Sequence, residues 1–290
     1  MKALKLNKLF ILFFPFVVFS QTDNKELEKM FGEDQNSRMK KNIDWVLLTK
    51  QDRERENKVY ELIKSGEIVT GKDFYNSAMI FQHGRDSISH GMAVKHMKRA
   101  IELDSTIDKW LLAAAIDRNL LSRNKPQIYG TQYLKMNGEN WKRSPIDTTQ
   151  VTDKERKLYH VESLSEQVEK IRNMNLLAIS EFHYKFNSIE KTVKFINSEN
   201  KKGLKSTYNI SEDELNTFGY ELIESKKTNE ALEIFLINTK LHPKSYNAFD
   251  SLGECLFILE KKEEAIKAYK KSLELNPKNE NAKKKISEKI

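Results

Sequence analysis

Hydrophobic residues recur at helical spacing through most of this chain. Val59, Leu62 and Ile63 share one face of a helix that is expected to begin at Asp52 and to end at Gly66. Apolar residues three or four positions apart mark one side of an α-helix. The same spacing returns over residues 74–81 and 93–101. The pattern therefore predicts a series of amphipathic helices.

Residues 110–116 (WLLAAAI) are apolar on every side, which predicts a buried central helix. A polar, irregular segment follows over residues 124–150. Turn-forming residues are scarce, with 10 glycines and 5 prolines among 290 residues. We expect an all-α fold of stacked antiparallel helical hairpins, interrupted by one irregular loop at 124–150.

The last quarter of the chain repeats itself at an offset of 34 residues. Such self-similarity is typical of repeat proteins, in which each unit is one supersecondary element. Each unit here reads as two helices, with a glycine where the helices approach closely and a proline that ends the second helix. The matching pairs are Leu215 and Phe249, Gly219 and Gly253, Leu222 and Leu256, Ala231 and Ala265, Phe235 and Tyr269, Leu241 and Leu275, and Pro243 and Pro277.

Over residues 211–277 this pattern resembles the tetratricopeptide repeat (TPR), although Asn238 stands where that family has a small residue. The resemblance implies a right-handed superhelix whose first helices line a concave groove for a peptide or protein. An acidic groove favours a basic or neutral extended segment. The matching groove positions are Asn216, Tyr220, Glu224, Asn247, Asp250, Glu254 and Phe257.

Two repeats leave an apolar face that only a neighbouring unit can cover. Apolar residues between 163 and 196 are expected to form helices that cover it, with a joint at 197–205. Ala282, Ile286 and Ile290 form one stripe of a final cap helix. The expected organisation is a helical domain of unknown function at 21–162, connecting helices at 163–205, two repeats at 206–277 and the cap at 278–290.

The amino terminus has the pattern of a secretory signal peptide at residues 1–20. Lys2, Lys5 and Lys8 precede an apolar run, 9–19, which ends at a polar pair. Eleven helical residues rise roughly 16 Å, about half of a bilayer core. We expect export to the periplasm or the cell exterior, without a lipid-modified cysteine or a stable membrane anchor; an uncleaved anchor is the alternative.

Composition adds few constraints on partners. The 50 basic and 42 acidic residues give a net charge of +8, spread along the chain, so no nucleic acid is indicated. The single cysteine, Cys255, is expected to be a buried free thiol. His83, His90 and His96 are spaced seven and six residues apart, and seven helical residues rise about 10 Å, too far for shared coordination. We expect neither a metal nor a cofactor.

Residues 30–170 resemble an uncharacterised bacterial family with three recurring features: Gln82-His83, Asp117-Arg118 and a Gln-x-Tyr-Gly-Thr-Gln loop at 127–132. The resemblance implies one site or one structural knot, and no activity. In one interpretation Asp117 and Arg118 satisfy the backbone of the following loop. In the other, a polar pocket forms where the loop meets the Gln-His pair, with Gln82, Gln127, Gly130 and Gln132 around it.

The favoured function is that of an exported, noncatalytic adaptor protein that uses the repeat groove. The alternative is a hydrolase-like or other enzyme whose histidine base activates a hydroxyl group. Its candidate residues are His83, Asp117, Arg118, Tyr129 and Thr131. No known catalytic motif accompanies them. A third hypothesis is a small-molecule or glycan binder that uses Trp141 and the same loop.

Overall fold

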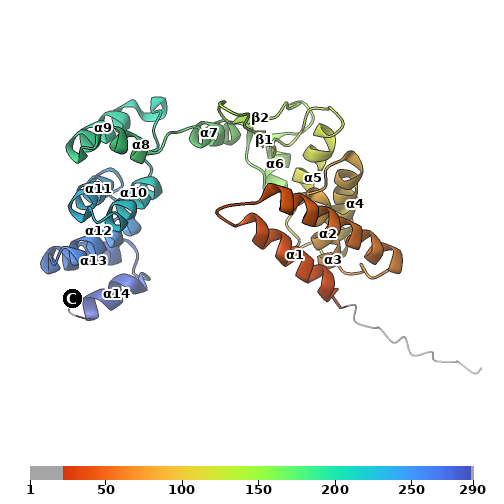
Figure 1. The fold of residues 1–290 in the computed structure, drawn as a ribbon, viewed down its shortest axis with the longest axis horizontal. Helices are drawn as coiled ribbons and strands as arrows, with labels where there is room; N and C mark the ends of the chain where they lie inside the picture. Colours follow the sequence, from red (N-terminus) through yellow and green to blue (C-terminus); the bar gives the residue numbers. More distant parts are fainter. Residues whose placement is uncertain (1–21, 289–290) are drawn as a thin grey trace, which may run out of the picture. The chain divides into compact units, whose positions relative to one another are not determined.

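Figure 1 shows the computed structural model, which describes residues 22–288. The regular secondary structure of the described chain is almost entirely helical, and the chain divides into two compact units between Gln167 and Val168. The signal peptide predicted at 1–20 and the last position of the predicted cap stripe, Ile290, lie outside the described residues. Within residues 22–288, no helix is both long enough and apolar enough to cross a membrane.

The first unit is a helical layer followed by the irregular loop. Helix α7 (Leu164–Met174) contains the dividing point. The other elements of this unit are α1 (Lys25–Arg38), α2 (Trp45–Ser65), α3 (Gly71–Gln82), α4 (Ser87–Leu103), α5 (Trp110–Leu121), β1 (Tyr133–Leu134), β2 (Lys142–Arg143) and α6 (Asp153–Leu158).

Side-chain caps set the helix starts in this unit. The predicted start of α2 at Asp52 is wrong, because Asp44 accepts the N–H groups of the first turn and the helix begins at Trp45. Its predicted end is confirmed, since Gly66 adopts φ 74°, a left-handed conformation that suits glycine. Thr70 and Asp73 form a reciprocal capping box at the start of α3.

The apolar faces of α1 to α5 pack on one another. Helix α3 lies against α1, α2 and α4, and α4 lies against α5. Residues Leu111 to Ala115 are buried, which confirms the predicted central helix, whereas Trp110 is 41% exposed. The loop expected at 124–150 contains a short antiparallel pair, β1 with β2, in which Tyr133 faces Arg143.

The second unit consists of three helical hairpins and a final helix. Its elements after α7 are α8 (Ile179–Phe186), α9 (Ile189–Lys202), the 3₁₀ turn η1 (Gly203–Lys205), α10 (Glu212–Glu224), α11 (Thr228–Leu241), α12 (Tyr246–Ile258), α13 (Lys262–Leu275) and α14 (Glu280–Ser287).

These hairpins stack in chain order, which confirms the helical-repeat architecture. Helix α8 contacts α10, α10 contacts α12, and α13 contacts α14. Ile179 and Ile196 of the first hairpin share the core of the repeats with Leu215, so upstream helices do cover the repeat face. The joint expected at 197–205 is not a break, because α9 continues through Lys202. Cys255 is buried, as predicted.

Close approach of paired helices explains the repeated glycines. A Cβ added at Gly219 would lie 2.5 Å from the Phe235 ring, and one at Gly253 would lie 2.9 Å from the Tyr269 ring. Both distances are far below van der Waals contact. Glycine at these two positions therefore lets a large aromatic ring fill the space between the helices of each repeat.

Gly219→Ala is expected to destabilise the second unit by about 1–3 kcal/mol, because the new methyl group overlaps the Phe235 ring. All three tryptophans lie in the first unit. Circular dichroism in urea should therefore show the loss, while tryptophan fluorescence stays unchanged. Phe235→Leu in the same chain should recover part of it. Gly32→Ala in α1, where a Cβ meets nothing within 4 Å, is the matched control and should be neutral or stabilising.

Candidate functional site

Helices α10 and α12 carry all seven predicted groove residues and lie side by side. Ser211 caps α10 by accepting the N–H of Glu214. The return bond of a capping box is absent, because Glu214 instead accepts the N–H of Ile179 in α8 at 3.2 Å. A side-chain hydrogen bond therefore joins α10 to α8, in addition to their packing contacts.

Tyr220 links the two helices at the middle of this surface. Its hydroxyl lies 2.8 Å from Oε2 of Glu254 and 3.1 Å from Oγ of Ser251. Burial raises the pKa of Tyr220, and the neighbouring Glu254 raises it further. The hydroxyl thus remains protonated and donates to the carboxylate. Glu254 keeps its second oxygen for another donor.

Helix α14 contacts the far edge of the same surface. Asp250 accepts hydrogen bonds from the side-chain amides of Asn279 and Asn281 at 2.8 and 2.7 Å. The ammonium group of Lys285 lies 5.1 Å from the centre of the Phe257 ring. Part of the predicted groove edge is therefore already in contact with the chain's own last helix.

The remaining predicted groove residues differ in their surroundings. Asn247 donates to Glu212 at 3.0 Å, and Glu224 is exposed. The amide oxygen of Asn216 is buried and has no hydrogen-bond partner within residues 22–288. A separate cavity lies between α11, α12 and α13, and its lining includes Leu232, Leu236 and Leu252. None of the seven predicted groove residues lines this cavity.

Charge separates clearly among the helices of the second unit. Neither α10 nor α12 contains a lysine or an arginine. Their acidic residues are Glu212, Asp213, Glu214, Glu221, Glu224, Asp250 and Glu254. Helices α13 and α14, by contrast, contain four and three lysines. The charged side chains of α10 and α12 are therefore all acidic, and we call the surface of these two helices the acidic strip.

In the first unit, Asp117 holds the Tyr-Gly-Thr loop from inside. Its Oδ1 accepts the N–H groups of Ile128 and Tyr129 at 2.8 and 2.9 Å. Its Oδ2 accepts the N–H groups of Gly130 and Thr131 at 2.9 Å each and the Thr131 hydroxyl at 2.8 Å. Of the two interpretations of Asp117, these contacts correspond to satisfaction of the loop backbone.

Two residues that the sequence did not predict, Arg156 and Gln167, hold the carbonyl side of the same loop. The guanidinium of Arg156 is fully buried and donates to the carbonyl oxygens of Ile128, Tyr129 and Val151 at 2.9, 3.0 and 2.7 Å. The amide of Gln167 donates to Tyr129 at 2.8 Å. Single polar residues in short helices give no periodic signal, so only the structure reveals them.

Three further residues complete this hydrogen-bonded network, which we call the loop knot: Gln127, Gly130 and Gln132. Gln127 donates to the carbonyls of Gln132 and Ser144 and accepts the N–H of Gln132. Gly130 has φ 90°, and any side chain there would strike Gln167. The predicted loop residues thus meet one another in a network that supports backbone geometry.

His83 is not placed beside Asp117, so the proposed base and its orienting carboxylate do not pair. Its Nδ1 lies 2.9 Å from Asp34 and 3.0 Å from Nε of Arg38. Burial raises the pKa of Asp34, but His83 and Arg38 outweigh it and hold that pKa at about 2. Arg118 donates to the Gln82 carbonyl and to the Gln132 side chain.

The candidate nucleophiles are also engaged elsewhere. Burial raises the pKa of Tyr129, which disfavours its phenolate, and the Thr131 hydroxyl donates to Asp117. The enzyme hypothesis is therefore not supported by the arrangement of its residues. Within the described chain, no three His, Cys, Asp or Glu side chains gather as metal ligands.

Residues 251–279 match the family model described as tetratricopeptide repeat. No curated protein matches the chain. Two solved structures have 15% identity to it. One, described as YrrB, a TPR protein with an unusual peptide-binding site, has a TM-score of 0.28 over 80% of this chain and 97% of its own. The other, the TPR2AB domain of yeast Sti1 with pHSP90, has a TM-score of 0.26 over 91% and 83%. The match to the family model and the stacked hairpins support a tetratricopeptide-type helical repeat in the second unit.

Proposed function

We propose that the protein is an exported adaptor that binds a basic, extended segment of a partner protein across α10 and α12. The observation that carries this proposal is the absence of basic residues from both helices, together with their packed acidic side chains. The charged and then apolar pattern of residues 1–20 supports the export part.

The contacts of Glu254 and Asp250 explain how the strip would hold such a segment. Each carboxylate is positioned by a neighbour, Tyr220 or Asn279, and so loses little freedom on binding. Each also has lone pairs left for a lysine or arginine of the partner. Helix α14 would close the strip at the Asp250 end.

Neutralising these two carboxylates is expected to weaken binding of a lysine-rich peptide. Asp250→Asn with Glu254→Gln keeps the side-chain shapes but removes two charges, so affinity at low salt should fall about tenfold. Fluorescence anisotropy of the labelled peptide on the full chain measures this change. A glutamate-for-lysine version of the peptide should bind neither chain.

Glu233→Gln with Glu263→Gln is the matched control, since it removes the same charge from exposed positions on α11 and α13. This chain should bind like the wild type. Equal weakening in both double variants would indicate only a general charge effect and contradict a specific strip. Unchanged binding after the Asp250 and Glu254 replacements would reject the proposed site.

A further inference from the structure

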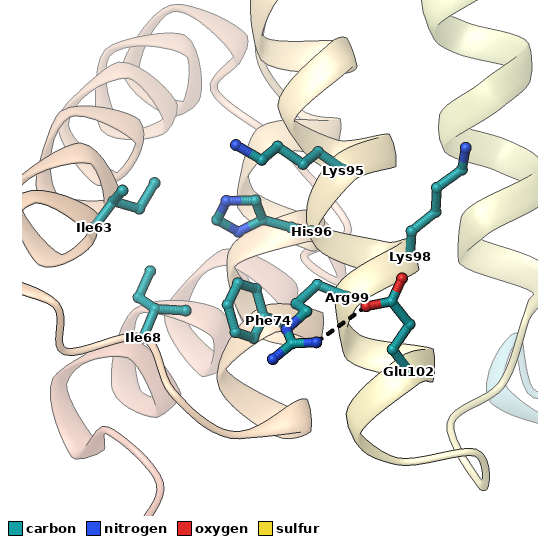
Figure 2. Close-up of a pocket in the computed structure, with 8 residues that line it drawn as sticks. All are labelled: Ile63, Ile68, Phe74, Lys95, His96, Lys98, Arg99 and Glu102. Carbon is teal, nitrogen blue, oxygen red and sulfur yellow. Dashed lines mark hydrogen bonds and ion pairs between the residues drawn. The ribbon is translucent and has the colours of Figure 1, made fainter.

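A cleft of about 590 Å³ opens in the first unit, between the end of α2 and the side of α4 (Figure 2). Its apolar wall comes from Ile63 on α2, Ile68 in the following turn and Phe74 on α3. This volume is within the range of small-molecule sites. The cleft belongs neither to the acidic strip nor to the loop knot.

His96 of α4 lies at the inner side of this cleft, with only 3% of its surface exposed. The ring centres of Phe74 and Phe81 lie 5.2 and 5.3 Å from that of His96. Its Nδ1 lies 2.6 Å from the Ser77 oxygen. We assign the Ser77 hydroxyl hydrogen to the Phe74 carbonyl, so that the Ser77 oxygen accepts from Nδ1–H. In this assignment the proton resides on Nδ1, and Nε2 is an acceptor.

No hydrogen bond to Nε2 of His96 exists within the described chain, and Figure 2 shows the ring directed across the cleft toward Ile63. Burial lowers the pKa of His96 to about 4, and the charge of Lys95 contributes. The ring is thus neutral at pH 7 and keeps its acceptor. Such a nitrogen is complemented by an O–H or N–H donor of a ligand.

Charged side chains line the rim of the cleft. Arg99 and Glu102 pair at 3.1 Å and offset each other. Lys95 and Lys98 form no ion pair within residues 22–288, so the rim keeps a positive charge. Figure 2 shows Lys95 extending over His96 toward the apolar wall. A cation, a bare acceptor and an apolar surface therefore lie together.

We propose that this cleft binds an aliphatic carboxylate that carries a hydroxyl group close to its carboxyl group. The carboxylate pairs with Lys95, the hydroxyl donates to Nε2 of His96, and the alkyl chain packs on Ile63, Ile68 and Phe74. A plain fatty acid lacks the donor at pH 7, and an inorganic anion lacks the chain. Only a ligand with all three features uses the whole site.

Titration of the full chain with 3-hydroxydecanoate tests the proposal. Decanoate lacks the hydroxyl, and 1,3-decanediol lacks the charge, so each comparison isolates one contact. We expect 3-hydroxydecanoate to bind about three- to tenfold more tightly than either compound, as one hydrogen bond or one exposed ion pair allows. The ¹⁵N resonance of His96 Nε2 should shift on saturation.

Two variants assign the contacts. Lys95→Gln should remove the preference for 3-hydroxydecanoate over the diol and leave the fold intact, because Lys95 is exposed. His96→Phe keeps the ring shape and should remove the preference over decanoate. Lys154→Gln, on the exposed side of α6, is the control and should bind like the wild type.

Equal affinities for the three compounds, or no saturable binding of 3-hydroxydecanoate, would overturn the proposal. So would an unchanged Nε2 resonance at saturation. If His96→Phe fails to fold through loss of the Ser77 contact, the Lys95→Gln chain and the wild-type resonance still decide.

Discussion

Replacing Asp117 with asparagine is expected to destabilise the first unit by about 3–5 kcal/mol. The carboxylate is fully buried and accepts four backbone N–H groups and one hydroxyl. An asparagine amide can still accept from Ile128 and Tyr129, but its NH₂ group would face the N–H groups of Gly130 and Thr131. Two buried donors would then lack an acceptor, and each such loss is costly.

Urea unfolding followed by tryptophan fluorescence measures this effect, because Trp45, Trp110 and Trp141 all lie in the first unit. Hydrogen exchange at the amides of 128–131 should accelerate as well. Asp147→Asn is the matched control in the same loop. Asp147 accepts from the Thr149 amide and hydroxyl at an exposed turn, so its replacement should cost less than about 1 kcal/mol. Equal losses in the two variants would contradict the role assigned to Asp117.

The sequence predicted the repeats well because their signal is periodic. Gly219 and Phe235 are separated in the chain but recur in both copies, so the pattern itself pairs them. Their contact is confirmed in the structure. Asn238 is the position where the repeat pattern departs from the small residue of that family. The structure shows it buried, with its amide donating to the Glu212 carbonyl and its oxygen unpaired within the described chain.

The polar parts of the first unit were harder to predict, because their contacts are long-range and not periodic. Asp117 and Arg118 are adjacent in sequence, yet one supports the loop and the other reaches Gln82, the residue before His83. His83 turns instead to Asp34 and Arg38. Which partner a buried polar group finds depends on how helices cross, and spacing along the chain does not contain that information.

The hydrogen-bond partner of His96 likewise could not be predicted from the sequence. Its spacing from the other two histidines bears only on metal binding, whereas its hydrogen-bond partner is Ser77, nineteen residues earlier. A histidine on an amphipathic helix gives no sign in the sequence of which nitrogen is bound. The hydroxyl of Ser77 and the Phe74 carbonyl decide it, and both lie on another helix.

Arg156→Met is expected to cost the first unit about 2–4 kcal/mol of unfolding free energy. Methionine fills much of the same space, but the carbonyls of Ile128 and Val151 lose their buried donor. The Tyr129 carbonyl keeps its bond from Gln167, which limits the loss. Tryptophan fluorescence in urea should show the change, together with faster tryptic cleavage in the loop at Lys135 or Lys142.

Combining Arg156→Met with Asp117→Asn tests whether the two residues hold the same loop segment or stabilise the unit independently. Asp117 binds the N–H groups and Arg156 the carbonyls of residues 128 and 129, so both act on the same backbone segment. Once either is lost the segment is released, and the second loss should add less than its separate cost, with a coupling above about 1 kcal/mol. Arg172→Met, at a half-buried arginine beyond the first unit, should leave tryptophan unfolding unchanged. Strict additivity of Asp117 and Arg156 would show that the two residues stabilise the unit separately, because a segment held from both sides can be released only once.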